Sequence, residues 1–217
     1  MVQVIPSQNI TLADLNKGFA LKKSEDEQFF TEWLTDLPVI SELEKQYLDR
    51  VKTNYLSLIE QSSPLKNIVK MVVLSPLLDL AGFYLPPFHL YTEEPIEICE
   101  TVIIDEQNQP EIIKGKIDVL VIQNQLWLLV IESKRSTFSL AKAIPQALTY
   151  MLANPYPKNP VYSLVMNGED FQFIKLAQKD NQPRYALSDR LTLYSRENEL
   201  YTVLQILKKL GQSLSYV

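Results

Sequence analysis

The sequence predicts an α/β protein of the α+β type, in which helices flank a mixed central sheet. Two short apolar runs, residues 117–122 and 126–131, are separated by a polar break and indicate an antiparallel hairpin. A helical pattern over residues 137–153 follows, and an apolar run at residues 161–166 indicates a strand that returns beside the hairpin. A helix between these strands makes a right-handed crossover, which puts parallel and antiparallel pairs in one sheet.

The composition is that of one folded domain. The chain has 217 residues, of which 46% are hydrophobic and 22% charged, so we expect a single domain over residues 1–217 with a well-buried core. Its start lacks the basic region and apolar core of a signal peptide, and its apolar runs are too short to span a membrane. We therefore expect a cytoplasmic protein without a membrane partner.

The charge and the scarcity of cysteine and histidine limit the classes of function. A net charge of −5 argues against coating nucleic acid by bulk charge, so contact with nucleic acid would have to be local. One cysteine and one histidine cannot form an internal disulfide or a zinc site with three or four such ligands. A metal ion bound here would have oxygen ligands.

We divide the predicted domain into three parts. Residues 1–62 form an N-terminal arm and helices, residues 63–176 form the core, and residues 177–217 form a C-terminal strand and helix. The first 23 residues show little periodicity apart from a short amphipathic piece around Leu15. Whether this arm is ordered stays open at the level of the sequence.

Helices are predicted before the sheet. An acidic first turn after Ser24, followed by aromatic residues, predicts a short helix that ends before Pro38. Ser41 and Glu44 have the spacing of a capping box, and apolar residues at helical spacing extend a helix over about 41–60.

A second predicted helix opens the core. Ser63 and Pro64 provide a capping side chain and a first-turn proline, and Gly82 ends the helix. Pro76 lies inside it and should kink it, because proline has no backbone N–H to donate.

Three consecutive antiparallel strands follow this helix. The first is predicted at residues 96–104, a turn at 105–110 leads into the second, and the hairpin supplies the third. Beyond the crossover, Asn167-Gly168 predicts a tight turn into a strand at residues 171–176. An amphipathic helix is predicted at residues 198–214.

Two carboxylates and a lysine should meet at the end of the hairpin. If its turn centres near Gln125, Asp118 lies directly across from Glu132, with Cβ atoms roughly 5 Å apart. Glu132 and Lys134 are two positions apart and point to the same face of their strand. Phosphodiester cleavage requires an oxygen-ligated divalent ion and a cation near the attacking water, which these residues could supply. The alternative is a solvated Asp118 and an ordinary surface pair at a strand end.

In these residues the chain resembles the PD-(D/E)XK nuclease superfamily. Ile117-Asp118, followed by Glu132-Ser133-Lys134 on the next strand, is similar to its signature. Gln146 and Tyr150 on the following helix resemble the Gln-x-x-x-Tyr element of the RecB-type branch and of the N-terminal nuclease domain of type I restriction enzyme R subunits. The order of elements also resembles the restriction-endonuclease-like αβββαβ core, over roughly residues 64–176.

The resemblance implies an Mg²⁺- or Mn²⁺-dependent endonuclease that hydrolyses DNA through metal-activated water. It assigns roles to six residues: Asp118, Glu132 and the Ser133 carbonyl as metal ligands, Lys134 beside the water, and Gln146 with Tyr150 beside the substrate.

The remaining basic residues near this motif could contact the phosphates of DNA. Lys116, Arg135 and Lys142, with Lys114 nearby, would form a local rim that faces phosphate. Ordinary solvated charge explains them equally well, so both interpretations stay open.

One departure from the superfamily pattern leaves alternatives open. Asn67 stands where the first core helix is expected to carry glutamate, and an amide is a poorer ligand for a hard cation. Either Glu60 or Glu97 substitutes, or one ion binds weakly, or the protein is a nucleic-acid-binding or assembly module that does not cut. A third hypothesis is a nuclease subunit that acts only with a motor or specificity subunit, or as a homodimer. The sequence has no helicase motif beside the nuclease-like motif, so no nucleotide cofactor is expected.

The helix after the motif adds one expectation about stability. Gln146 and Tyr150 are four residues apart and lie on one side of the helix, largely apart from its apolar stripe. We therefore expect Gln146 to lie at the edge of the packed face and to contribute little to folding.

Overall fold

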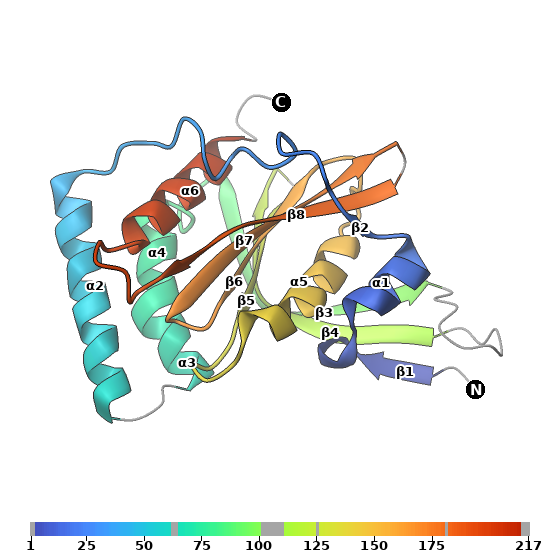
Figure 1. Ribbon diagram of the computed structural model, residues 1–217, viewed down its shortest axis with the longest axis horizontal. Coiled ribbons are helices and arrows are strands. Elements are labelled where there is room, and N and C mark those ends of the chain that lie inside the picture. Colours follow the sequence, from blue (N-terminus) through green and yellow to red (C-terminus); the bar gives the residue numbers. More distant parts are fainter. Residues whose placement is uncertain (1–2, 62–64, 101–110, 125, 181, 214–217) are drawn as a thin grey trace.

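In the part of the chain that the structure describes, the strands form one eight-stranded mixed sheet with helices on both faces (Figure 1). The computed structural model describes residues 3–61, 65–100, 111–124, 126–180 and 182–213. The predicted class, a mixed sheet flanked by helices, is confirmed. The strands follow in the order β1 (Gln3–Pro6), β4 (Glu111–Gln123), β5 (Leu126–Ser133), β6 (Val161–Met166), β7 (Asp170–Lys179), β8 (Gln182–Thr192) and β2 (Lys22–Lys23), while β3 (Phe88–Glu100) pairs with β4.

The centre of the sheet follows the pattern predicted from the sequence. β4 and β5 form the antiparallel hairpin, and their last paired residues at the open end are Val119 and Ile131. Asp118 and Glu132 are one position further along, so the expected opposition of the two acids is confirmed. Helix α5 (Leu140–Leu152) then crosses one face, and β6 returns parallel to β5.

The helices α2, α4 and α6 cover one face of the sheet, and α1 and α5 cover the other (Figure 1). α2 (Glu42–Gln61) begins with the predicted capping box, in which the Ser41 backbone N–H donates to Glu44 Oε2 at 2.7 Å. α6 is Leu200–Ser213. Each face has its own apolar cluster, and the strands β4, β5 and β6 contribute residues to both. The centre of the sheet is therefore buried on both sides.

The second predicted helix is divided into α3 (Lys66–Val69), a π-helical turn (Lys70–Leu74) and α4 (Ser75–Leu80). Pro76 stands in the first turn of α4, directly after the π-helical turn. Proline cannot donate the backbone hydrogen bond that a continuous helix requires, so the ladder widens before it.

Two expectations for the N-terminal half are wrong. Residues 24–37 form turns that cross the sheet, because tertiary contacts outweigh their helical pattern: Glu32 Oε1 accepts hydrogen bonds from Tyr162 at 2.8 Å and Lys175 at 2.5 Å. Strand β3 begins at Phe88, not at Ile96. The predicted strand end and turn at residues 101–110 lie outside the described residues.

The N-terminal arm, whose order stayed open, is part of the sheet. β1 pairs parallel with residues 111–114 of β4, and β5 pairs antiparallel with residues 119–123. Because β3 pairs along the whole other edge of β4, β1 and β5 must share one edge. Residues 115–118 of β4 lie between the part that pairs with β1 and the part that pairs with β5. After β1 the arm leaves the sheet and forms helix α1 (Leu12–Phe19), which confirms the amphipathic segment predicted around Leu15.

Within the described ranges, no helix is long and apolar enough to cross a membrane. The cytoplasmic location stays a prediction.

Candidate functional site

The Asp118 carboxylate is the most heavily contacted group of the site. Its residue is 1% exposed, because β4 is covered on both faces. The backbone N–H of Ser133 donates to Oδ2 at 2.9 Å. Two ammonium groups reach the other oxygen, Lys66 at 2.5 Å and Lys70 at 3.1 Å. A buried carboxylate needs such partners, because burial without them would cost several kcal/mol or neutralise the group.

The Glu132 carboxylate is also 1% exposed but has fewer partners. Lys134 Nζ lies 2.6 Å from its Oε1, and its Oε2 is buried without a hydrogen-bond partner among the described residues. Burial raises the pKa of Glu132 to about 7, and the negative charge of Asp118 adds to the effect. The carboxylate thus has one oxygen held by a cation and one that is free to accept another ligand.

A chain of hydrogen bonds connects Glu132 to helix α5 and the arm. Lys134 Nζ donates to Gln146 Oε1 at 2.7 Å, and Gln146 Nε2 donates to the Tyr150 hydroxyl at 2.5 Å. The Tyr150 hydroxyl is 3.0 Å from Ser7 Oγ. Burial, and then the charge of Glu132, raise the pKa of Tyr150, so it stays a neutral hydrogen-bonding group at physiological pH.

The expectation that Gln146 buries little is wrong. Gln146 is 9% exposed and Tyr150 is 1% exposed. The sequence pattern separated their stripe from the apolar face of α5, but the arm lies over that stripe and covers it. Both the oxygen and the nitrogen of the Gln146 side-chain amide are therefore hydrogen-bonded inside the protein.

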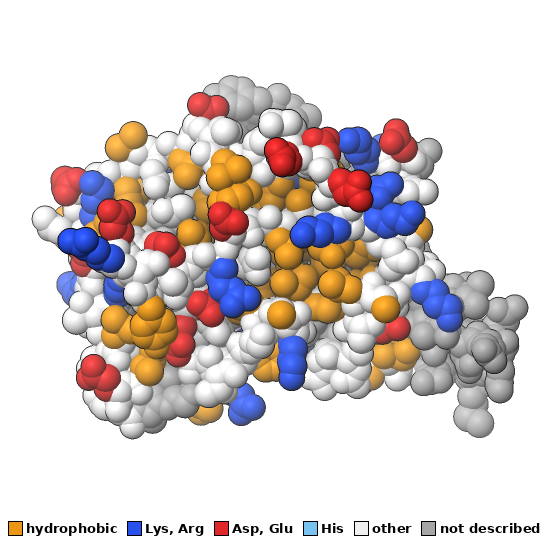
Figure 2. All heavy atoms as spheres, in the orientation of Figure 1, with side chains coloured by type: hydrophobic (Ala, Val, Ile, Leu, Met, Phe, Trp, Pro, Cys, Tyr) orange, Lys and Arg blue, Asp and Glu red, His pale blue; other side chains and the backbone are white. Residues whose placement is uncertain are grey.

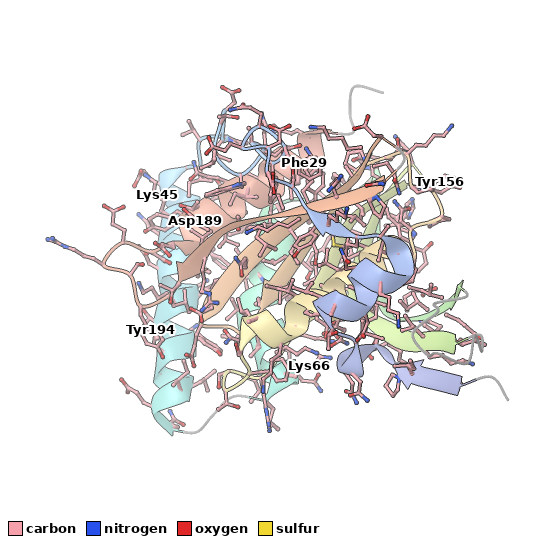
Figure 3. All side chains as sticks on the ribbon, turned by 45° about the vertical axis from the view of Figure 1, so that its right-hand side comes forward. Phe29, Lys45, Lys66, Tyr156, Asp189 and Tyr194 are labelled. Carbon is pink, nitrogen blue, oxygen red and sulfur yellow. The ribbon has the colours of Figure 1, made fainter. Side chains whose placement is uncertain are left out.

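The helix before the sheet supplies lysines where the resemblance called for an acid. Asn67 is exposed, and its neighbours Lys66 and Lys70 contact Asp118 instead. Figure 3 shows Lys66 at the start of α3, low on the side of the molecule where α5 begins. Lys66 and Lys70 are four residues apart on a short, mostly apolar segment, and this spacing is the sequence pattern that could have indicated their shared contact with Asp118.

Neither proposed substitute for Asn67 joins the two acids. Glu60 is exposed on α2, and Glu97 lies 3.2 Å from Lys114. Over the described residues, no group of three or more His, Cys, Asp or Glu is arranged to hold a metal ion. Neither Glu60 nor Glu97 therefore supplies a third acidic ligand beside Asp118 and Glu132.

Glu93 is a site residue that the sequence did not indicate. It lies on β3 at the position opposite Asp118, between the pairs Thr92–Val119 and Glu94–Ile117. Its φ of 55° is in the left-handed region, which costs about 1–3 kcal/mol for a residue of this kind and often marks a functional position. Its Oε1 accepts from Lys70 at 3.0 Å, and this contact lowers the pKa of Glu93.

Gly115 allows the arm to approach the site. A Cβ at this position would lie 2.4 Å from Ser7 Oγ and 2.7 Å from Tyr150 Cε1. Ser7 itself is buried, although it lies in the arm whose order was open. No signal in the sequence connected Ser7 with Tyr150, because 143 residues separate them.

The residues of the expected basic rim lie at the surface, and their contact with phosphate stays a prediction. Lys114 forms an ion pair with Glu97. Lys116, Arg135 and Lys142 are exposed to solvent. Lys142 lies on α5 beside a groove that Lys134 also lines.

Comparison with known proteins gives no assignment. A scan against protein-family models finds no match, and a search of the curated proteins finds none either. The similarity to the PD-(D/E)XK superfamily rests on the motif and the order of elements, and family membership stays a prediction.

Proposed function

We propose that the protein is a divalent-metal-dependent nuclease that hydrolyses DNA phosphodiester bonds, on a restriction-endonuclease-like core of the RecB type. One observation carries this proposal: two buried carboxylates, Asp118 and Glu132, lie at the end of a central hairpin beside the Lys134–Gln146–Tyr150 chain. A pair of buried acids, of which Glu132 has a raised pKa, beside a lysine is typical of catalytic sites, because burial of such a cluster is costly without a function.

The donor set fits a hard divalent cation in part. Asp118 and Glu132 offer carboxylate oxygens, and Oε2 of Glu132 is buried without a partner among the described residues. Ser133, whose carbonyl is the other expected ligand, directly follows Glu132 in sequence. These residues would hold Mg²⁺ or Mn²⁺. When bound, the ion would polarise a phosphate and lower the pKa of an attacking water.

The hydrogen bonds through Gln146, Tyr150 and Ser7 position the ammonium group of Lys134. Lys134 is held between Glu132 and Gln146, so its ammonium group has a fixed place beside the carboxylate. In this place it can orient a water molecule or stabilise negative charge on a phosphate. Tyr150 and Ser7 fix Gln146 in turn, so the geometry depends on the arm.

A specific observation favours a second candidate function, a nucleic-acid-binding or assembly module that does not cut. Lys66 and Lys70 neutralise Asp118 as a metal ion would, and they are built into the fold. In such a module the two acids would keep the lysines in place, and no ion would be required.

Cleavage assays separate the two candidates. Plasmid and oligonucleotide DNA are incubated with wild type, Asp118→Asn and Lys134→Met in Mg²⁺, Mn²⁺ or EDTA, and circular dichroism confirms that each variant is folded. We expect cutting by wild type alone and only with metal. Cutting by all three preparations would indicate a contaminant. Binding of DNA without cutting, together with no Mn²⁺ binding in calorimetry, would establish the second candidate.

A further inference from the structure

A groove lies between the N-terminal arm and helix α5. Its volume is about 710 Å³. It is lined by Gln8, Asn9, Ile10, Thr11, Leu12 and Ala13 from the arm and by Lys134, Phe138, Lys142 and Pro145 from the segment that begins at the site. Figure 2 shows apolar side chains on the face that carries α1 and α5, with basic side chains on either side.

The groove is continuous with the candidate site through Lys134. The same ammonium group that contacts Glu132 lies 5.2 Å from the centre of the Phe138 ring, and the two residues line the groove together. A ligand that fills the groove therefore meets the lysine that is paired with Glu132.

The chemistry of the groove suits an unpaired nucleotide. Phe138 offers an aromatic ring on which a base can stack, Lys142 offers an exposed cation for a phosphate, and Gln8 and Asn9 offer amide donors and acceptors. None of the lining residues is acidic, although the chain as a whole carries a net charge of −5. This local lack of negative charge removes the repulsion that phosphates would meet on much of the surface.

The wall formed by the arm favours a single strand over a duplex. β1 holds the arm to β4, and the contact of Ser7 with Tyr150 closes it onto α5. A base can enter such a groove and stack on Phe138 only if its own faces are free, whereas bases in a duplex are stacked on each other.

We propose that this groove, the arm groove, binds an unpaired nucleotide of a single-stranded nucleic acid next to the scissile phosphate. The inference rests on the proposed function for the position of the phosphate, and it names the substrate class of the same site. Single-stranded ends, gaps and flaps would then be bound in preference to blunt duplex.

Binding is measured by fluorescence anisotropy in EDTA, so that no cleavage is required. The probes are a fluorescein-labelled deoxythymidine oligonucleotide, the ribonucleotide counterpart and a blunt hairpin duplex. Lys142→Glu and Phe138→Leu test the groove, and Lys158→Glu is the matched control, because Lys158 is exposed beyond the other end of α5. We expect Kd for the single strand to rise about five- to a hundredfold in the groove variants, the range for loss of one stacking contact, and to stay within twofold in the control.

Three outcomes decide the inference. Tighter binding of the single strand, lost in the groove variants only, supports it, and the two single-stranded probes tell whether the sugar matters. Equal affinity for duplex and single strand, or unchanged affinity in the groove variants, overturns it. If the variants lose single-strand binding but wild type cuts nothing in Mn²⁺, the arm groove stands as a binding site and the nuclease function falls.

Discussion

At the scale of single residues, the site is a cluster of charges that burial makes interdependent. Glu132 has one ammonium partner, Lys134, whereas Asp118 has two ammonium groups and a backbone N–H. In a buried site, removal of one partner leaves the other uncompensated, so charge-removing substitutions in this cluster change both stability and chemistry.

Glu132 should make the stability depend on pH. Its folded pKa of about 7 lies above the ordinary value of 4.5, so the folded state binds more protons between these values, and the free energy of unfolding falls as pH rises through this window. The loss is on the order of 3 kcal/mol for this shift. Urea unfolding in EDTA from pH 4.5 to 8 should show the fall in wild type and a flatter profile in Glu132→Gln. Parallel profiles would contradict the raised pKa.

Gln146 should be both a structural and a positioning residue. Gln146→Ala removes two hydrogen bonds from a buried position, one to Lys134 and one to Tyr150, so we expect a loss of about 1–3 kcal/mol in the free energy of unfolding. Cleavage per folded molecule should fall about ten- to a thousandfold, because Lys134 loses its support. Gln178→Ala, at an exposed position of β7, is the control for both measurements. Full activity in the folded variant would remove Gln146 from the site.

At the scale of elements, α3 and the π-helical turn determine how available Asp118 is. Both Lys66 and Lys70 contact Asp118 Oδ1, so a metal ion would compete with them for this oxygen. Lys66→Gln should therefore tighten Mn²⁺ binding in calorimetry by about tenfold, since one competing charge at close range is worth a few kcal/mol at most.

The same Lys66→Gln variant should have a lower free energy of unfolding in the absence of metal, because the buried Asp118 carboxylate loses one of its two ammonium partners. Lys45→Gln, in an exposed pair on α2, serves as the control and should change neither property. Weaker Mn²⁺ binding in Lys66→Gln would mean that the lysine supports the ion and does not compete with it.

The approach of β1 and the arm to β4 depends on Gly115. Gly115→Ala places a methyl group where Ser7 and Tyr150 now lie, so the arm or the tyrosine must move. We expect a loss of about 1–3 kcal/mol in the free energy of unfolding and weaker activity, measured by urea unfolding and cleavage. The double variant with Ser7→Gly should recover part of both, because it removes the nearer contact. A single variant with wild-type stability would show that the arm is looser than its contacts indicate.

At the scale of the whole molecule, the sequence predicted the centre of the fold well and its periphery poorly. The hairpin, the crossover through α5 and the opposition of Asp118 to Glu132 follow from local apolar patterns, which a continuous stretch of chain contains. The helix predicted at residues 24–37 was wrong, because Glu32 bonds to distant strand residues.

The site residues that the sequence missed have the same explanation. Ser7, Lys66 and Glu93 come from other elements and join the site only in the folded chain. Ser7 contacts Tyr150, Lys66 contacts Asp118, and Glu93 lies opposite Asp118. Which distant segments come into contact cannot be predicted from one sequence. Here the arm and β3 supply contacts that no local sequence motif indicates.

The single-domain prediction can be tested with the two tryptophans of the chain. Trp33 packs against the apolar cluster on the face of α2, α4 and α6, and Trp127 packs against the cluster on the face of α5. The strands β4, β5 and β6 contribute to both clusters, so neither face can lose its packing without exposing the other side of the same strands.

We therefore expect one cooperative transition. Trp33→Phe and Trp127→Phe each leave one fluorescent reporter, and urea unfolding followed by either reporter and by circular dichroism should give coincident midpoints after correction for the stability of each variant. The circular dichroism of the same variant is the internal control, because it follows the whole chain. If the Trp33 signal changed at lower urea than the circular dichroism, the segment of residues 24–37 and its helical face would unfold as a separate unit, and the chain would contain more than one cooperative domain.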